Sequence, residues 1–165
     1  MKLTKKDIAI NGVLAAAYFV LTLITYPLSY GLIQVRLSEI LIILCFFNPK
    51  YLLGLTVGCL LANTFSTLNI LDTLIGTVAT LLSCVLISLM KNLLLSCLIP
   101  IIINAFLIGL EIYLFIGSPY WVAVGYVALG EFVVMVVSYI LFANLRKSEK
   151  FLKLIDAKRN VDFKF

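Results

Sequence analysis

The stretch LLLSCLIPIIINAFLIGLEIYLFI, residues 93–116, holds 24 residues and a single charged side chain, Glu111. About 20 apolar residues in a helix are enough to cross the ~30 Å hydrocarbon layer of a membrane. The rest of the chain has a similar composition, since 63% of its 165 residues are hydrophobic and only 13% are charged. A soluble domain of this size needs more charge to cover its surface. The sequence therefore predicts a helical integral membrane protein.

Five more apolar segments flank this stretch and are separated from one another by short breaks. We predict one membrane domain over residues 1–165, with spans at roughly 8–28, 38–47, 51–68, 71–90, 93–116 and 121–145 and a basic tail over 146–165. Pro100 either kinks the fifth span or starts it. The first segment could imitate a signal peptide, but its length and the absence of a polar domain directly after it favour a span. The predicted fold class is an all-α bundle of six transmembrane helices.

The lysines and arginines give this bundle a direction. With the amino terminus inside and six crossings, twelve of the thirteen basic residues fall on one side, as the positive-inside rule expects. We therefore predict a multi-pass protein of the cell membrane with both termini in the cytoplasm. The net charge of +5 follows from this sorting and does not indicate nucleic-acid binding. Arg36 is the exception, because it is predicted at the outer side.

Ionisable residues inside apolar spans cost about 2.5–3.5 kcal/mol each on insertion scales, so they usually face a cavity or one another. By depth, the outer half of the membrane is predicted to hold Arg36, Glu39, Asp72, Glu111 and Glu131. Neutral polar residues follow the same trend, namely Tyr18, Thr22, Thr25, Tyr26 and Ser29 on one face of the first span, Asn63 and Thr67 near the end of the third, and Asn104 in the fifth. The pattern predicts a polar cavity that is open to the outside.

Each ionisable residue also has a structural alternative. Arg36 and Glu39, three residues apart, could simply pair with each other. Asp72 could cap its helix. Glu111 and Glu131 have no basic neighbour on their own helices, and either could neutralise Arg36 across the bundle or stay protonated in a low-dielectric site.

The charge balance restricts the ligand that such a cavity would accept. One arginine against four acidic residues leaves it up to three charges negative if all of them ionise. That balance suits a cation, or a neutral ligand rich in N–H groups that carboxylates can accept. It disfavours phosphates and carboxylates.

Two further features allow both a structural and a functional interpretation. Trp121 and Tyr120 fit an aromatic belt at the membrane interface, and either could also stack on a planar ligand. Gly12 and Ala16 form a small-xxx-small pair on the first span. That pair could pack inside this chain or form a docking face for a partner membrane protein.

Several kinds of chemistry lack their residues or motifs in this sequence. Histidine, the commonest general base and metal ligand, is absent. The cysteines Cys45, Cys59, Cys84 and Cys97 stand singly in apolar runs, which is typical of packing residues rather than a metal or redox site. The sequence has neither a G-x-x-x-x-G-K-[ST] nucleotide loop nor a G-x-S-x-G elbow. We predict a binding protein that is not an enzyme, carries no cofactor or metal, and needs partners to move its solute.

The segment Ile33-Gln34-Val35-Arg36-Leu37-Ser38-Glu39 resembles the I-Q-x-R-x-S-E pattern of the QueT family. These proteins are the substrate-binding (S) components of energy-coupling factor (ECF) transporters for queuosine precursors. The likeness continues through residues 58–63, 71–81, 104–111 and 130–131, so that it covers roughly residues 8 to 145. The first span departs from the family's A-x-x-x-A face and offers Gly12 and Ala16 instead.

The resemblance implies a six-helix bundle of the ECF S-component type in the bacterial cell membrane. It implies capture of a deazaguanine, either queuine or an aminomethyl or cyano precursor, followed by uptake with a transmembrane coupling (T) subunit and two cytoplasmic ATPases. The T subunit would contact Gly12 and Ala16. The residues expected to bind substrate are Arg36, Glu39, Asn63, Asp72, Asn104, Glu111, Trp121 and Glu131. The alternatives are an S component for another vitamin or nucleobase, and a structural membrane protein without a small-molecule ligand.

Overall fold

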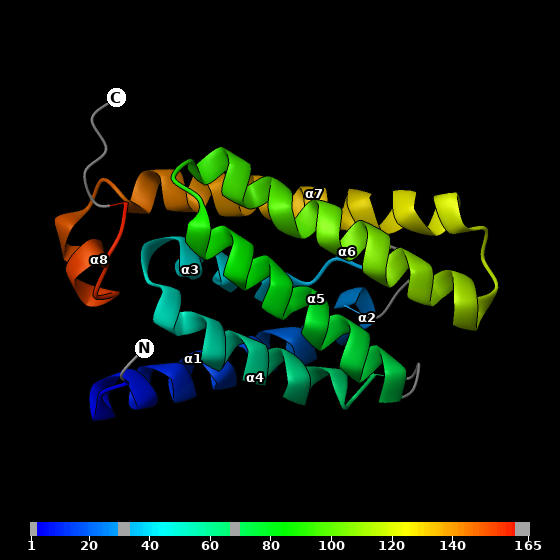
Figure 1. Cartoon of the computed structure of the whole chain (residues 1–165), viewed down its shortest axis with the longest axis horizontal. Helices are drawn as coiled ribbons and strands as arrows, with labels where there is room; N and C mark the ends of the chain where they lie inside the picture. Colours follow the sequence, from blue (N-terminus) through cyan, green and yellow to red (C-terminus); the bar gives the residue numbers. More distant parts are fainter. Residues whose placement is uncertain (1–2, 30–33, 67–69, 161–165) are drawn as a thin grey trace.

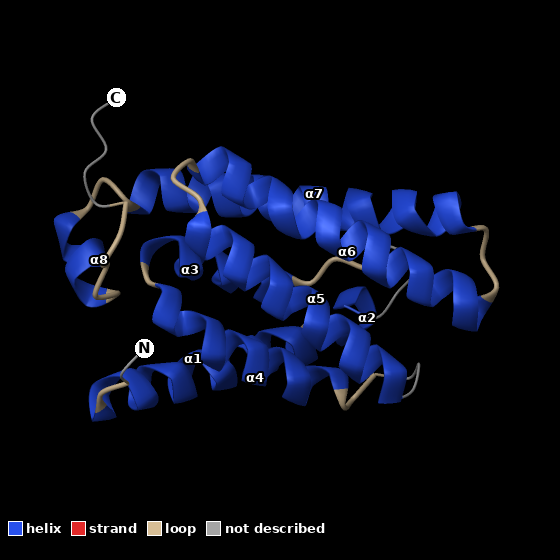
Figure 2. Ribbon diagram, viewed as in Figure 1, coloured by secondary structure: helices blue, strands red, loops and turns tan. Residues whose placement is uncertain are grey.

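The computed structural model describes residues 3–29, 34–66 and 70–160, and gives only the backbone of residues 70–72. Within these ranges every regular element is a helix, which confirms the predicted all-α class (Figure 2). The elements are α1 (Lys5–Ile24), α2 (Tyr26–Ser29), the 3-10 helix η1 (Leu37–Ile43), α3 (Leu44–Phe47), the 3-10 helix η2 (Pro49–Tyr51), α4 (Leu52–Asn63), α5 (Ile70–Leu89), α6 (Leu93–Ile116), α7 (Tyr120–Leu145) and α8 (Glu149–Leu154).

Three of the described helices, α1, α6 and α7, are long and apolar enough to cross a membrane. Two shorter apolar helices lie at 37–47 and 73–89. Pro100 lies inside α6, so it does not start that helix. The predicted third span is shorter than expected, because α4 ends at Asn63 rather than near residue 68. The count of six crossings therefore stays a prediction.

The long helices lie side by side in the order α1, α4, α5, α6, α7, with each helix packed against the next (Figure 1). Residues 34–47, which we call the crossing segment, run through the interior of this arrangement and contact α1, α5 and α7 through η1. Ile42, Ile43, Phe46 and Phe47 of this segment are completely buried. The crossing segment is thus part of the protein core, whereas large apolar side chains on the outer faces of the long helices are exposed, as lipid contact requires.

The contact between α1 and α4 depends on two glycines of α4. A Cβ atom on Gly54 would lie 2.8 Å from Cα of Asn11, and one on Gly58 would lie 2.7 Å from the Ala15 carbonyl oxygen. Packing inside the chain therefore uses the Asn11 and Ala15 side of α1. Gly12 and Ala16 lie on the exposed side of that helix.

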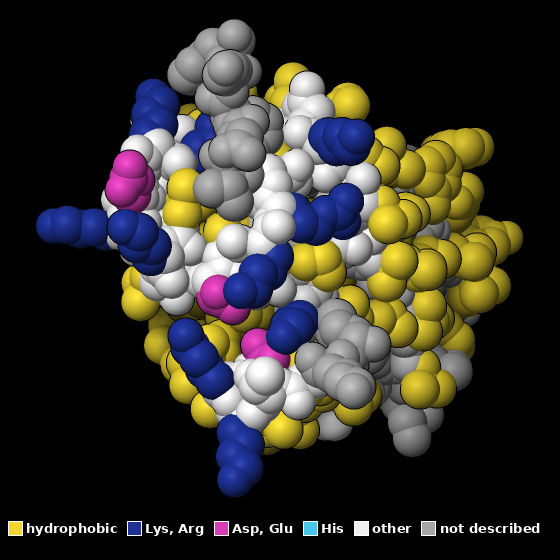
Figure 3. Space-filling model, turned by 60° about the vertical axis from the view of Figure 1, so that its left-hand side comes forward, with side chains coloured by type: hydrophobic (Ala, Val, Ile, Leu, Met, Phe, Trp, Pro, Cys, Tyr) yellow, Lys and Arg dark blue, Asp and Glu magenta, His cyan; other side chains and the backbone are white. Residues whose placement is uncertain are grey.

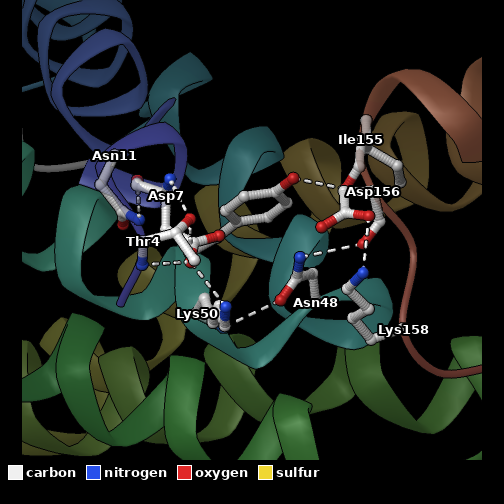
Figure 4. Close-up of polar contacts among 9 residues, drawn as sticks. Thr4, Asp7, Asn11, Asn48, Lys50, Ile155, Asp156 and Lys158 are labelled. Atoms are coloured by element: carbon white, nitrogen blue, oxygen red, sulfur yellow. Dashed lines mark hydrogen bonds and ion pairs between the residues drawn. The ribbon is translucent and has the colours of Figure 1, made fainter. Parts of the chain in front are cut away.

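Basic side chains gather at one end of the bundle, while hydrophobic side chains cover its flanks (Figure 3). This end includes the first turn of α1, residues 48–51 with η2, residues 90–92 between α5 and α6, and the region around α8. Lys50 joins two of these parts through an ion pair of 2.6 Å with Asp7, which also closes a capping box with Thr4 (Figure 4). Of the basic residues that the structure describes, Arg36 alone is buried.

The chain after α8 crosses this basic end as a strap, residues 155–160, which we call the C-terminal strap. Asn48 Nδ2 donates to the Asp156 carbonyl at 3.0 Å (Figure 4), and the backbone N–H of Lys158 donates to the Phe47 carbonyl at 2.9 Å. Asn160 Nδ2 donates to the carbonyls of Phe46, at 2.8 Å, and Met90, at 3.2 Å. The last carbonyls of a helix have no partner within it. The strap satisfies such carbonyls at the ends of α3 and α5 and ties these ends together.

Replacing Asn160 by alanine is expected to lower the melting temperature of the protein in detergent by several degrees. The substitution removes two hydrogen bonds and leaves two carbonyls without that donor, at a cost of about 1–3 kcal/mol. Differential scanning fluorimetry measures the change. Lys153→Ala is the control, because the Lys153 side chain is exposed and its ion pair of 3.7 Å with Glu149 lies at the surface. Equal melting temperatures for Asn160→Ala and the control would contradict a stabilising strap.

Candidate functional site

The crossing segment carries Arg36 and Glu39 into the interior, where their side chains are 4% and 1% exposed. Arg36 directly precedes η1, and its Nε donates to the Ser29 carbonyl at 3.2 Å. The tight turn of η1 then brings Glu39 N–H to the Arg36 carbonyl at 3.0 Å. The segment therefore delivers a guanidinium and a carboxylate to the same buried region.

The polar face predicted on the first span holds this segment in place. The Thr22 hydroxyl hydrogen-bonds with the Ser38 hydroxyl at 2.7 Å, and the Ser29 hydroxyl donates to the Thr22 carbonyl at 3.2 Å. Tyr18 donates through its hydroxyl to Glu39 Oε1. The prediction was that this face lines an open cavity. In the structure its buried hydroxyls bind to the crossing segment and to α1 itself.

Helix α5 approaches Glu39 from another side. Thr80 Oγ1 lies 3.5 Å from Glu39 Oε1 and 3.1 Å from Cys59 Sγ of α4. Asn63 Nδ2 in turn donates to Cys59 Sγ at 3.4 Å. A Cβ atom on Gly76 would lie 2.5 Å from Asn63 Nδ2 and 3.7 Å from Arg36 Nη1, so Asn63 and Arg36 both lie against this glycine. Asn63 therefore belongs to the same buried group as Arg36 and Glu39.

Helices α6 and α7 complete the group. Asn104 Nδ2 donates to Glu131 Oε1 at 2.7 Å, and both side chains are buried. Gly130 packs directly on the backbone of Gln34, since a Cβ atom there would lie 2.8 Å from the Gln34 carbonyl carbon. Arg36 is close enough to interact electrostatically with Glu39 and with Glu131. We call Arg36, Glu39, Asn63, Asn104 and Glu131 the polar cluster.

The structure does not bring all the predicted residues together. Glu111 is 1% exposed and lies two turns beyond Asn104, on the part of α6 that contributes Ile108 and Ile112 to a second apolar cluster. Trp121 is 73% exposed and its ring contacts Tyr120, at 5.1 Å between centroids. That exposure favours the interfacial belt over stacking on a buried ligand. The side chain of Asp72 lies outside the described part of the structure, as does Thr67.

Two residues that touch the cluster, Thr80 and Cys59, were not among the predicted site residues. A signal was present on α5, because Thr73, Gly76 and Thr80 are spaced at i, i+3 and i+7 and so share one face. On α4, Cys59 and Asn63 are four residues apart and share a face in the same way. Both signals were weak because cysteine and threonine are common in apolar helices.

Three buried oxygen atoms of the polar cluster have no hydrogen-bond partner within the described chain: Glu39 Oε2, Asn63 Oδ1 and Glu131 Oε2. The amide oxygen of Asn63 accepts hydrogen bonds, and so do the two glutamate oxygens when their carboxyl groups are ionised. Within the described residues, no group of three or more Cys, Asp or Glu side chains is arranged to hold a metal ion. The arrangement therefore suits a small ligand with several N–H donors.

A family model described as the QueT transporter matches residues 8–147 of the chain. The chain is 31% identical over 160 residues to the queuosine precursor transporter QueT of Lactococcus lactis subsp. cremoris (strain MG1363), in an alignment that covers 86% of this chain and 92% of that protein. No solved structure gives a significant match.

Proposed function

The chain belongs to the QueT transporter family, and we propose that it is the substrate-binding S component of an ECF importer for a queuosine precursor. The substrate would be queuine or an aminomethyl or cyano deazaguanine, captured from outside the cell. A T subunit and two cytoplasmic ATPases would then drive its uptake. Family membership identifies a transporter rather than an enzyme.

The three acceptor oxygens of the polar cluster carry this proposal. A buried acceptor without a partner costs about 1–3 kcal/mol, so native proteins rarely leave several together unless water or a ligand satisfies them. A deazaguanine offers complementary donors, because its ring N–H and its exocyclic amine can both donate to a carboxylate. The cation of an aminomethyl precursor would suit a second carboxylate.

The distribution of charge supports the proposed orientation. The basic end carries both the start of α1 and the C-terminal strap (Figures 1 and 3), which an even number of crossings requires. Under the positive-inside rule this end faces the cytoplasm. The proposal therefore places both termini in the cytoplasm, with six crossings in total.

The exposed side of α1 supports a place for the partner subunit. A Cβ atom on Gly12 would meet no other atom within 4 Å, and Ala16 is exposed one turn further along. Small residues on an exposed face allow another helix to approach closely in a membrane. We include Gly12 and Ala16 in the proposal as the contact for the T subunit.

A binding titration of the purified protein in detergent tests the proposed substrate. The panel contains queuine, aminomethyl-deazaguanine, cyano-deazaguanine, guanine and common vitamins. We expect a deazaguanine to raise the melting temperature and to release heat on binding. A response to guanine or a vitamin alone would favour an S component of other specificity. No response to any compound would contradict the substrate assignment.

Substitution of Glu39 or Glu131 by glutamine is expected to weaken deazaguanine binding by about tenfold or more. Each substitution replaces a carboxylate acceptor by an amide, and hydrogen bonds to charged groups contribute about 1.5–3 kcal/mol. Isothermal titration calorimetry measures the dissociation constants. Glu149→Gln is the control, because Glu149 is exposed on α8 outside the proposed site. Unchanged affinity in both site variants would rule out recognition by these carboxylates.

A further inference from the structure

The two carboxylates of the polar cluster share one arrangement. Glu39 Oε1 accepts hydrogen bonds from Tyr18 of α1 and Thr80 of α5, while Glu39 Oε2 has no partner within the described chain. Glu131 Oε1 accepts from Asn104 of α6, and its Oε2 is likewise without a partner. Each carboxylate therefore has one oxygen held by a neighbouring helix and one that remains available.

We propose that Tyr18 and Asn104 are positioning residues, each of which holds one oxygen of a carboxylate and so selects the other oxygen as the acceptor for the ligand. This inference rests on the proposed function and assigns roles within that same site. It adds Tyr18 to the site and gives Asn104 a role that acts through Glu131 rather than on the substrate.

The chemistry of the Tyr18 hydroxyl supports a positioning role. The side chain is completely buried, and a phenol has a single donor proton, which here is used on Glu39. Because that proton is used, Tyr18 has none left to donate to the substrate, which is rich in N–H donors. Such a substrate needs acceptors whose direction is fixed before it binds, because an unheld carboxylate would lose rotational freedom on binding.

The residues that hold the two carboxylates, Tyr18 and Asn104, lie on different helices. The directions of the two remaining oxygens therefore depend on how the helices of the bundle pack. Tyr18 belongs to α1, which also holds the crossing segment through Thr22 and Ser38. Asn104 belongs to α6 and reaches Glu131 on α7. Two acceptors held independently would favour a ligand with two separate donor groups over a ligand with one.

Double-mutant cycles on binding of aminomethyl-deazaguanine test this assignment. Tyr18→Phe alone is expected to weaken binding by about tenfold, since the hydroxyl is worth about 1.5 kcal/mol to a charged acceptor. In the Glu39→Gln background the same substitution should have almost no effect, because the group through which Tyr18 acts has already changed.

Asn104→Leu should likewise weaken binding when it is introduced alone and have almost no effect on the affinity in the Glu131→Gln background. The crossed pairs, Tyr18→Phe with Glu131→Gln and Asn104→Leu with Glu39→Gln, should be additive.

Tyr126→Phe is the control for loss of a tyrosine hydroxyl, because Tyr126 is 44% exposed on α7 and lies outside the polar cluster. It should leave the affinity unchanged. Full additivity of Tyr18→Phe with Glu39→Gln would overturn the assignment, since it would show that Tyr18 contacts the ligand directly or only supports the fold.

An infrared measurement on ligand-free protein separates this inference from the proposed function. The carboxyl band that disappears in Glu39→Gln should shift in Tyr18→Phe, and the band lost in Glu131→Gln should shift in Asn104→Leu. If no deazaguanine binds the unmodified protein, the proposed function fails, and the band shifts still decide whether the two residues hold the carboxylates. If binding is normal but the bands stay in place, the positioning roles are wrong and the proposed function stands.

Discussion

Replacing Gly130 by alanine is expected to weaken deazaguanine binding by about tenfold or more while the helix content stays unchanged. A Cβ atom at this position would lie 2.8 Å from the Gln34 carbonyl carbon and closer still to its oxygen. Because both of these atoms belong to the backbone, no change of side-chain rotamer relieves the overlap. Gln34 lies two residues before Arg36, and Gly130 directly precedes Glu131. The added methyl group must therefore displace one half of the polar cluster from the other.

The expected loss of affinity follows from the cost of overpacking, which is about 1–3 kcal/mol. A change of about 1.4 kcal/mol in binding free energy corresponds to about tenfold in affinity. Gly125→Ala is a matched control in the same helix, since a Cβ atom on Gly125 would meet no atom within 4 Å. Calorimetry gives the affinities, and circular dichroism gives the helix content. If Gly130→Ala bound as tightly as Gly125→Ala, the contact between α7 and the crossing segment would have no part in binding.

Long apolar runs with clear end signals placed α6 within residues 93–116 and α7 close to 121–145, although Pro100 left the start of α6 open. Asn92 caps α6 by accepting from the backbone N–H groups of Leu94 and Leu95, and Gly117 ends the helix in the left-handed region at φ 79°. These are the residue types that begin and end helices most often. Helix α4 was predicted about five residues too long, because the apolar pattern gave too little weight to Asn63, Thr64 and Ser66, whose side chains compete for backbone hydrogen bonds.

The crossing segment shows a different limit. Residues 38–47 of this segment were predicted as a span, but the first part of that stretch belongs to the 3-10 helix η1 (Leu37–Ile43) and not to an α-helix. After Glu39 the segment is an unbroken apolar run, residues 40–47, which has no periodicity that could distinguish one helical form from another. The same limit explains Trp121, since α7 is apolar all round and its sequence does not reveal which face points outward.

The position of each residue along its predicted span identified the members of the polar cluster. It did not identify the residues with which they form hydrogen bonds. Arg36, Glu39 and Glu131 were predicted to lie at similar depth, and the structure does bring them together. Which oxygen of each carboxylate is held depends on how helices pack side by side, and spacing along one helix carries no such information. The C-terminal strap is a similar case, because Asn48 and Asp156 meet across 108 residues of sequence without any local signal.

Replacing Arg36 by methionine is expected to have the largest effect on stability of any substitution in the cluster. Arg36 is 4% exposed and interacts electrostatically with both Glu39 and Glu131. Removing one partner from a buried set of charges costs about 3–5 kcal/mol, because the remaining charges are left without compensation. The variant should give little monodisperse protein and a melting temperature lowered by ten degrees or more, about what such a loss implies for a domain of this size.

A second substitution distinguishes loss of charge balance from loss of packing. In Arg36→Met with Glu131→Gln, one negative charge is removed together with the positive one, so much of the lost stability should return. Arg36→Lys should fall between the native protein and Arg36→Met, because lysine keeps the charge but lacks the planar fork with which arginine donates in several directions. If the double variant were no more stable than Arg36→Met, the arginine would act through packing and its hydrogen bond to Ser29 rather than by balancing the carboxylates. The position of Arg36 beside Glu39 and Glu131 would then give no support to a donor-rich ligand. Recovery of stability in the double variant would show that Arg36 balances the buried carboxylates, and so keeps both of them in the interior of the native protein, where a donor-rich substrate can meet them.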